Sequence, residues 1–358
     1  MMNKLKLGVL FGGQSTEHEV SIVSGLSILK NLDTEKFQIH PIYINKKGEF
    51  FEYTDNFSTF GPLTVGDKII IPEKLKKIDN IINYLKGFDL LFPVLHGLYG
   101  EDGTIQGLFE LLEIPYVGCR VLSSSIGMDK AYTKIIFDRA KIAQAKYVYI
   151  RKYKHSYIYI DEQFNETILD LPKITDIICN KLEFPMFIKP SNSGSSVGIS
   201  KAHNIKELGS AIEYAAKFDN KILIENGING REVECAVLGN EDVIASCVGE
   251  ILPAEEFYSF DSKYKNSESK VIIPADLDDE ISNEIRTLAI KAFKSIDGKG
   301  LARVDFFVEN NTNKVYINEI NTMPGFTEIS MYPKLFNQVG LSYRDLLSKI
   351  IDLALECN

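Results

Sequence analysis

The chain has 358 residues, of which 45% are hydrophobic and 25% charged, and its formal net charge is −9. This length predicts two to three domains with buried cores, and the composition is typical of a globular protein. No apolar run is long enough to cross a bilayer, and the negative charge argues against a nucleic-acid partner.

The N-terminal apolar run, residues 7–11, is too short for a secretory signal and has no cleavage site of small residues after it. Five cysteines are present, an odd number, and none has the C-x-x-C spacing of a zinc or redox centre. We therefore expect a cytoplasmic protein with reduced thiols.

The first part of the chain predicts a parallel sheet. Gly12 and Gly13 predict a tight turn after a buried strand, and Thr16 and Glu19 have the spacing of a capping box that opens a helix. The further predicted elements are the strands 5–11, 37–44 and 88–95 and the helix 104–112. This β-α-β order predicts a first domain, residues 1–125, with its functional loops at one edge of the sheet.

Two further domains are expected, residues 126–220 and residues 221–358. The predicted elements of the second are a helix at 128–143, strands within 147–160 and at 184–189, and a turn-rich loop at 190–198. Those of the third are the strands 221–225, 232–238 and 243–252, the helix 279–296, a hairpin of 300–308 with 314–320, and the helix 342–355. The long aperiodic stretch 254–274 predicts a loop of the kind that often forms a lid.

The hairpin carries the most informative polar residues. Because side chains alternate along a strand, Arg303 and Asp305 share one face, and Glu319 and Asn321 share one face of the partner strand. Carboxylate and amide oxygens suit Mg²⁺, and an arginine beside them can bind a phosphate. From spacing alone, the same pattern also fits a polar outer face with cross-strand ion pairs.

Other candidate residues allow two readings in the same way. Lys189 precedes the Ser/Gly-rich loop, which suits ATP phosphates although the loop is not a Walker A motif. Glu17 could bind a ligand or favour a helix dipole, and His96 could serve a ligand or be a buried hydrogen-bonded residue. The Pro324-Gly325 pair predicts a turn whose N–H groups could face a developing negative charge.

Taken in order, five motifs resemble the D-alanine:D-alanine ligases of the ATP-grasp superfamily over nearly the whole chain. The motifs occupy residues 11–21, residues 95–104, Met128-Asp129-Lys130, residues 189–198 and residues 318–327. The resemblance implies an α/β fold of the ATP-grasp type, with three domains and an N-terminal Rossmann-like parallel sheet. ATP would lie between the second and third domains, and the amino acids under the loops of the first.

For the amino acids, the resemblance implies that Glu17 anchors the ammonium of the first D-alanine with help from His96. Ser195 and Tyr264 would complete a hydrogen-bonded network with Glu17. The remaining substrate-binding residues implied are Val20, Ser330 and Met331, and those stabilising the tetrahedral intermediate are Arg303 and the Gly325 N–H.

For ATP and metal, the resemblance implies three further groups of residues. Phosphates would meet Lys130, Lys189, Ser196 and Lys263, the last of these from the lid. Adenosine would meet Glu225 and Glu232. Two Mg²⁺ ions, or Mn²⁺ in their place, would bind Asp305, Glu319 and Asn321.

The implied reaction joins two D-alanines through an acyl phosphate, for peptidoglycan precursor synthesis, in an enzyme expected to be a homodimer. Tyr264 stands where the lactate-forming relatives carry histidine, and Met331 where serine- and lactate-forming relatives usually carry arginine. Both residues favour D-alanine as the second substrate, and a D-alanine:D-serine or D-lactate ligase is the alternative. A pseudo-ligase that binds ATP without turnover would lack a metal ligand or Glu17, and both are present.

Overall fold

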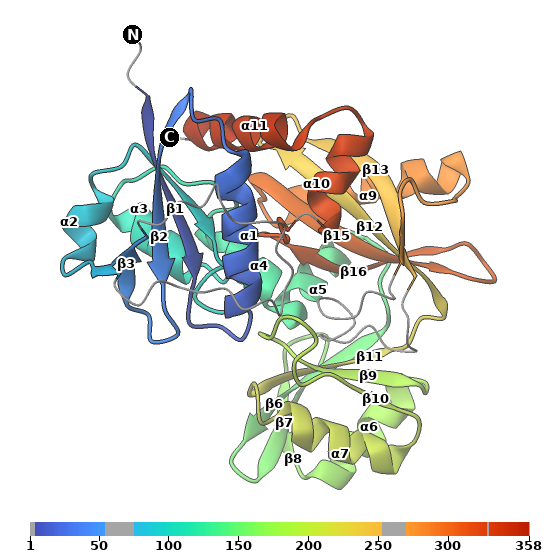
Figure 1. The fold of residues 1–358 in the computed structure, drawn as a ribbon. Helices are drawn as coiled ribbons and strands as arrows, with labels where there is room; N and C mark the ends of the chain where they lie inside the picture. Colours follow the sequence, from blue (N-terminus) through green and yellow to red (C-terminus); the bar gives the residue numbers. More distant parts are fainter. Residues whose placement is uncertain (1–3, 54–74, 253–269, 328, 358) are drawn as a thin grey trace.

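The computed structural model describes residues 4–53, 75–252, 270–327 and 329–357. Its strands form three sheets, which with their helices make three units that meet at the centre of the molecule (Figure 1). The first sheet is mainly parallel and the other two are antiparallel, so the expected mixed α/β fold is confirmed.

The first unit contains the parallel sheet. Its strand order is β4-β3-β2-β1-β5, with parallel pairing of β2, β1 and β5 and two short antiparallel strands at the edge. The strands are β1 Leu5–Gly12, β2 Phe37–Ile44, β3 Phe50–Glu52, β4 Lys76–Lys77 and β5 Leu90–Val94, and the helices are α1 His18–Asn31, α2 Ile81–Leu85, α3 Thr104–Leu111 and α4 Val121–Met128. Because β1 and β5 are parallel neighbours, the loops that follow them lie at the same edge, as predicted.

The predicted capping box at the start of α1 is wrong. The helix begins at His18 with Glu17 as its N-cap residue, and the Glu17 side chain makes no capping hydrogen bond. Glu19 instead pairs with Lys46, with 3.0 Å between Oε1 and Nζ. The Glu17 carboxylate accepts a hydrogen bond from the Ser195 hydroxyl of the second unit, so a tertiary contact replaces the local one.

The second unit is a six-stranded antiparallel sheet in the order β10-β9-β11-β6-β7-β8. Its strands are β6 Tyr147–Tyr153, β7 Ser156–Ile160, β8 Glu166–Leu169, β9 Met186–Pro190, β10 Ser200–Ala202 and β11 Lys221–Asn226, and its helices are α5 Lys130–Arg139, α6 Leu171–Lys181 and α7 Ile205–Ala215. Buried residues of α6 and α7, including Ile178 and Ile212, form one core with the sheet. Strand β11 lies between β9 and β6, so this sheet extends past residue 220.

The third unit is a five-stranded antiparallel sheet in the order β14-β13-β12-β15-β16. Its strands are β12 Gly230–Gly239, β13 Ile244–Leu252, β14 Lys270–Ile272, β15 Gly300–Glu309 and β16 Val315–Asn321, and its helices are α9 Asp279–Ser295, α10 Met331–Gln338 and α11 Tyr343–Glu356. The predicted hairpin is confirmed, and its register sets Arg303 opposite Asn321 and Asp305 opposite Glu319. Strand β14 shows that the expected loop 254–274 ends too late, and residues 253–269 lie outside the described part.

One apolar core joins the first and third units. It includes Leu26 of α1, Phe92 of β5, Phe326 after β16 and Leu347 of α11, all fully buried. Figure 1 shows α11 lying across the end of α1, in agreement with contacts between the two helices. Each such buried side chain stabilises the fold by roughly 1.5–3 kcal/mol, so these two units are held together by packing.

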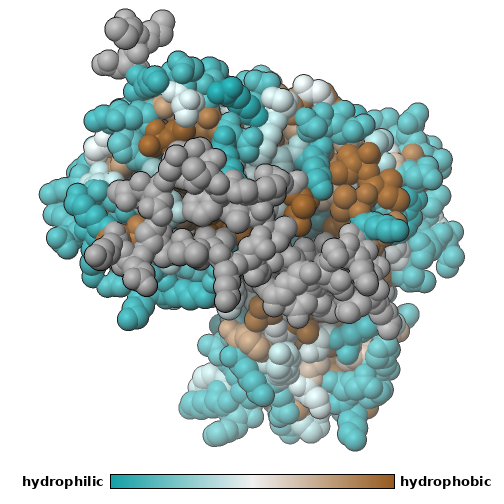
Figure 2. Space-filling view, in the orientation of Figure 1, coloured by the Kyte–Doolittle hydropathy of each residue, from teal (hydrophilic) through white to brown (hydrophobic). Residues whose placement is uncertain are grey.

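Outside its grey area, the face in Figure 2 is mainly hydrophilic, as expected for a globular protein with 25% charged residues. Hydrophobic residues reach this face in separate areas. All five cysteines are free thiols. Within the described residues, no helix has the length and apolarity that crossing a membrane requires.

Candidate active site

Loops from all three units surround a cavity of about 170 Å³, here called the central cavity. Most of the residues that the sequence predicts for the functional site line this cavity. Those lining it are Glu17, His96, Lys130, Ser195, Ser196, Arg303, Glu319, Asn321, Gly325, Ser330 and Met331.

Glu17 forms a buried anion at the contact between the first and second units. Its side chain accepts a hydrogen bond from the Ser195 hydroxyl, and only 6% of the residue is exposed. Two glycines leave room for the carboxylate, since a Cβ on Gly97 would lie 2.7 Å from Glu17 Oε2 and one on Gly194 would lie closer still. Ser195 itself has a left-handed backbone with φ 48°, which is uncommon for a residue with a side chain. The chain therefore maintains an unusual backbone that places a hydroxyl on this carboxylate.

A second carboxylate, Glu101, lines the same cavity. The Gly97 N–H donates to Glu101 Oε1 over 2.8 Å. Burial, with the nearby negative charge of Glu17, raises the pKa of Glu101 to about 8. At neutral pH Glu101 is therefore mostly protonated and adds little negative charge beside the Glu17 carboxylate.

His96 is a buried connector rather than a proton donor at neutral pH. Its Nδ1 lies 3.1 Å from the Met323 carbonyl oxygen and its Nε2 lies 3.0 Å from Ser24 Oγ. Since a carbonyl can only accept, Nδ1 carries the proton and Nε2 accepts from the Ser24 hydroxyl. Burial lowers the pKa of His96 to about 4, so the ring is neutral. His96 thus ties α1 and the β5 loop to the turn that contains Gly325.

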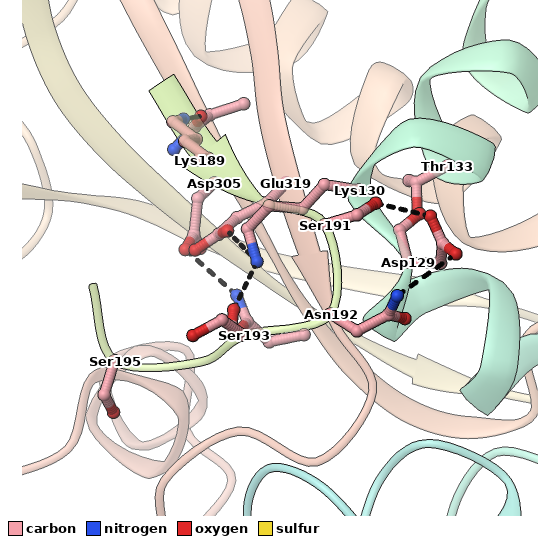
Figure 3. Close-up of polar contacts among 12 residues, drawn as sticks. Asp129, Lys130, Thr133, Lys189, Ser191, Asn192, Ser193, Ser195, Asp305 and Glu319 are labelled. Carbon is pink, nitrogen blue, oxygen red and sulfur yellow. Dashed lines mark hydrogen bonds and ion pairs between the residues drawn. The ribbon is translucent and has the colours of Figure 1, made fainter. Parts of the chain in front are cut away.

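The loop after β9 is fastened to the start of α5, as Figure 3 shows. The Ser191 hydroxyl donates to Asp129 Oδ1 over 2.6 Å, and the Lys130 ammonium donates to the Ser193 carbonyl over 2.6 Å. Lys130 Nζ also lies 4.0 Å from Glu319 Oε2 on the hairpin. The Lys130 ammonium therefore lies between the loop and the hairpin of the third unit. A phosphate bound at this ammonium would contact both.

A smaller cavity of about 10 Å³, here called the side cavity, lies beside the central one. Charged residues dominate its lining, which includes Lys130, Lys134, Lys189, Glu225 and Glu319. Glu225 bridges two ammonium groups, that of Lys189 and that of Lys134, the latter at 2.9 Å. Burial would raise the pKa of Glu225, but these two lysines hold it at about 2.

Lys189 stays positively charged despite its burial. Burial alone would lower the pKa of the Lys189 ammonium, but the carboxylates of Glu225 and Glu319 raise it above its ordinary value. Glu232 on β12 contributes to the same effect. The predicted nucleotide residues Lys189, Glu225 and Glu232 are thus electrostatically linked.

The hairpin brings the predicted metal ligands together around Arg303. The guanidinium contacts both carboxylate oxygens of Asp305, at 2.7 and 2.8 Å, and the Asn321 amide donates to Asp305 over 3.1 Å. On the other side, Arg303 Nε lies 3.0 Å from Glu234 Oε2 of β12. Arg303 therefore lies between two buried carboxylates.

The donor set fits Mg²⁺. Asp305 and Glu319 face each other across the hairpin, and Asn321 adds an amide oxygen two residues after Glu319. These are hard oxygen donors, and the described residues contain no cluster of three His, Cys, Asp or Glu placed to hold a metal by themselves. Part of the coordination sphere of an ion here would come from substrate oxygens or water.

Some predicted residues lie elsewhere. Val20 is 1% exposed within α1 and is not among the described residues that line the central cavity. Asp305 and Glu232 do not line the central cavity, although Arg303 and Glu234, each two residues away on the same strand, do. Lys263 and Tyr264 lie outside the described residues.

The sequence reasoning missed three charged residues at the site, Lys134, Glu234 and Glu101. Lys134 follows Lys130 by one helical turn, so a shared helix face was a usable signal. Glu234 follows Glu232 by two residues on one strand, which places it on the same face. Glu101 lies within the motif at residues 95–104, but no role was predicted for it. Only the tertiary fold brings it close to Glu17.

Comparison with known proteins identifies the family of the chain. The N-terminal model of the D-ala D-ala ligase family matches residues 6–119, and the C-terminal model matches residues 136–352. A curated D-alanine–D-alanine ligase from Acetivibrio thermocellus is 50% identical over 99% of this chain and 97% of its own length. One from Clostridium acetobutylicum is also 50% identical, over 99% of both chains.

Solved structures show the same fold. The VanG D-Ala:D-Ser ligase from Enterococcus faecalis superposes with a TM-score of 0.82 at 36% identity, covering 98% of this chain and 100% of that one. The D-alanine–D-alanine ligase from Coxiella burnetii gives a TM-score of 0.80 at 33% identity, over 99% and 94%. With family models that match both its N-terminal and its C-terminal part, and with relatives 50% identical over 99% of its length, the chain belongs to the D-alanine–D-alanine ligase family.

Proposed function

We propose that this chain joins two D-alanines to D-alanyl-D-alanine with ATP, through a D-alanyl phosphate. One observation carries the proposal: a single cavity presents an ammonium anchor, Glu17 with Ser195, together with the anion-binding Arg303. Enzymes of this family use ATP and Mg²⁺, and full-length relatives at 50% identity carry this activity in their names.

The first D-alanine binds through its two charged ends. Its ammonium pairs with the Glu17 carboxylate, next to Glu101, which is mostly protonated at neutral pH. Its carboxylate then points toward Lys130 and the hairpin, where ATP phosphates bind between the loop 191–196 and Glu319. Holding both reactants in one orientation turns a collision into an effectively unimolecular step.

Two bond exchanges complete the reaction. A carboxylate oxygen of the first D-alanine attacks the γ-phosphorus, the bond from that phosphorus to the bridging oxygen breaks, and ADP leaves. The neutral amine of the second D-alanine then attacks the acyl carbon. The amine gives up one proton to the departing phosphate, the bond from carbon to phosphate oxygen breaks, and phosphate leaves with the electron pair.

The chain's own residues stabilise the charge that develops in both steps. Lys130 and Lys189 offset the negative charge of the phosphates, and Arg303 and the Gly325 N–H face the oxyanion of the tetrahedral intermediate. Asp305, Glu319 and Asn321 would hold two Mg²⁺ ions, which would offset the negative charge of the phosphates. Losing one such donor typically costs about 3 kcal/mol in the barrier.

The second substrate is assigned as D-alanine from the apolar end of the central cavity. Here the apolar end means three lining residues of the third unit, Met331 and the paired strand residues Ile251 and Val271. An apolar pocket suits a methyl group, but it rejects an added hydroxyl only by about a hundredfold. D-serine is therefore the alternative acceptor to test, particularly since a structural relative is a D-Ala:D-Ser ligase.

The test is phosphate release from Mg·ATP with D-alanine alone, and then with D-alanine plus D-serine or D-lactate, with products identified by mass. The expected product is D-alanyl-D-alanine in every mixture. A preferred mixed product would overturn the assignment of the second substrate, and absence of phosphate release with any D-amino acid would overturn the ligase assignment.

We also infer a homodimer. Two exposed leucines support an interface on the first unit: Leu111 of α3, which is 85% exposed, and Leu122 of α4, which is 58% exposed. Light scattering coupled to size-exclusion chromatography measures the mass of the protein in solution. A mass of 40.3 kDa, that of a monomer, would contradict the inference.

A further inference from the structure

Lys134 is a buried ammonium without a role in the reaction described above. It lies one turn after Lys130 on α5, and only 3% of it is exposed. A buried charge is costly unless it is paired, and within the described part of the chain Glu225 is its one carboxylate at ion-pair distance, 2.9 Å away. Its ammonium also lies 5.4 Å from the centre of the Tyr147 ring.

Glu225 therefore has two cationic partners of different origin. Lys134 comes from α5, and Lys189 comes from the end of β9, directly before the loop 191–196. Lys189 Nζ also lies 3.4 Å from Asn318 Oδ1, next to the predicted metal ligand Glu319. Lys189 thus contacts the hairpin on which the metal and the phosphates are expected.

Glu225 and a phosphate compete for the Lys189 ammonium. While this ammonium neutralises Glu225, it offers less charge and fewer N–H donors to a phosphate. If Lys189 were the only partner of Glu225, then moving it toward ATP would leave a buried carboxylate without a counter-ion, at a large energetic cost. With Lys134 in place, Glu225 keeps one counter-ion.

We propose that Lys134 is a positioning residue that holds Glu225 in the side cavity and thereby releases Lys189 to bind the phosphates of ATP. This inference rests on the proposed assignment of Lys189 to the phosphates. Lys134 acts through Glu225 and touches no substrate itself. Its removal therefore weakens the binding of nucleotides that carry phosphates. It leaves that of adenosine almost unchanged, because Glu225, which is expected to meet adenosine, is then still held in place by Lys189.

The experiment compares the dissociation constants of Mg·ATP and of adenosine, measured by calorimetry without D-alanine. In K134M, the ATP constant is expected to rise about tenfold, the effect of weakening one hydrogen bond between charged groups, while the adenosine constant stays near that of the unmodified chain. An unchanged ATP constant, or an equal rise for both ligands, would overturn the proposal. If K134M does not fold, K134Q has the same expected outcome.

A coupled variant and a matched control sharpen the result. In E225Q, the neutral amide no longer holds Lys189, so adding K134M to E225Q should not change the ratio of the two constants further. The control is K299M, because Lys299 is another partly buried lysine, paired with Glu241 on the third unit and absent from the lining of both the central and the side cavity. A change of the ratio in K299M as large as in K134M would refute a specific role.

The failure of this inference can be told apart from that of the proposed function. The binding assay needs no turnover, so Lys134 can be tested even if the chain forms no dipeptide. Conversely, a chain that makes D-alanyl-D-alanine but shows equal losses for ATP and adenosine in K134M would keep its function and lose only this role for Lys134.

Discussion

Replacing Gly194 by alanine should damage the Glu17 anchor while leaving the fold intact. A Cβ at this position would lie 3.0 Å from Glu17 Cδ and closer still to Oε2, whereas ordinary contacts begin near 3.4 Å. The carboxylate must therefore move by about 1 Å. Because it is the end of a side chain, it can move without displacing the backbone, so the free energy of unfolding should change little.

The catalytic effect should be much larger, since a misplacement of about 1 Å can cost a hundredfold in rate. We expect kcat/KM for D-alanine to fall about a hundredfold, or about 2.7 kcal/mol, with the dissociation constant of ATP unchanged. Phosphate release at varied D-alanine concentrations measures the first quantity and calorimetry the second.

The matched control is Gly209→Ala in α7. There the nearest atom to the new Cβ is Leu171 Cδ2 at an ordinary 3.8 Å. This variant should keep normal kinetics and gain roughly 0.5–1 kcal/mol of stability, as glycine is costly inside a helix. Normal D-alanine kinetics in a folded G194A protein would refute the role given to the Glu17 position.

Three further predictions concern charge. The pKa of His96 is about 4 in the fold against 6.5 when unfolded, so its contribution to stability is complete above pH 6.5 and is lost as pH falls toward 4; urea unfolding should show that H96Q loses this part of the pH dependence. Glu101 is protonated below its pKa of about 8, so E101Q should match the unmodified chain in kcat/KM at pH 7 and differ from it only above pH 8, and a large change at pH 7 would show that Glu101 acts as an anion. D305N should raise the Mg²⁺ concentration needed for half-maximal activity at least several-fold, whereas E250Q, which alters another buried carboxylate paired with an arginine in the same sheet, should not; an unchanged Mg²⁺ titration in D305N would exclude Asp305 as a ligand.

Local patterns predicted the elements of the site better than their contacts. Alternation along two strands was enough to predict that Arg303 and Asp305 share one face and that Glu319 and Asn321 share one face of the partner strand. The register that sets Asp305 opposite Glu319 was not predicted and comes from the structure. The short edge strands β3 and β4 were not predicted, since three and two residues carry almost no periodicity.

The contacts that escaped prediction join residues far apart in sequence. The spacing of Thr16 and Glu19 suggested a capping box, but the carboxylate next to them interacts with Ser195, 178 positions later. Likewise, nothing local to Lys134 shows that β11 will bring Glu225 to it. Burial and charge compensation decide such contacts, and both depend on how the three units pack.

The origin of the lining residues has a consequence for how selectivity can change. The first D-alanine is proposed to bind at a seam between two units, where Glu17, Gly97, Gly194 and Ser195 constrain one another across the chain. The apolar end assigned to the second substrate takes Ile251, Val271 and Met331 from the third unit alone. Mutations within a single unit can therefore exchange the acceptor, whereas a new donor amino acid would require simultaneous changes in two. We therefore expect the specificity for the second amino acid to change more readily than the specificity for the first, which is activated by phosphorylation.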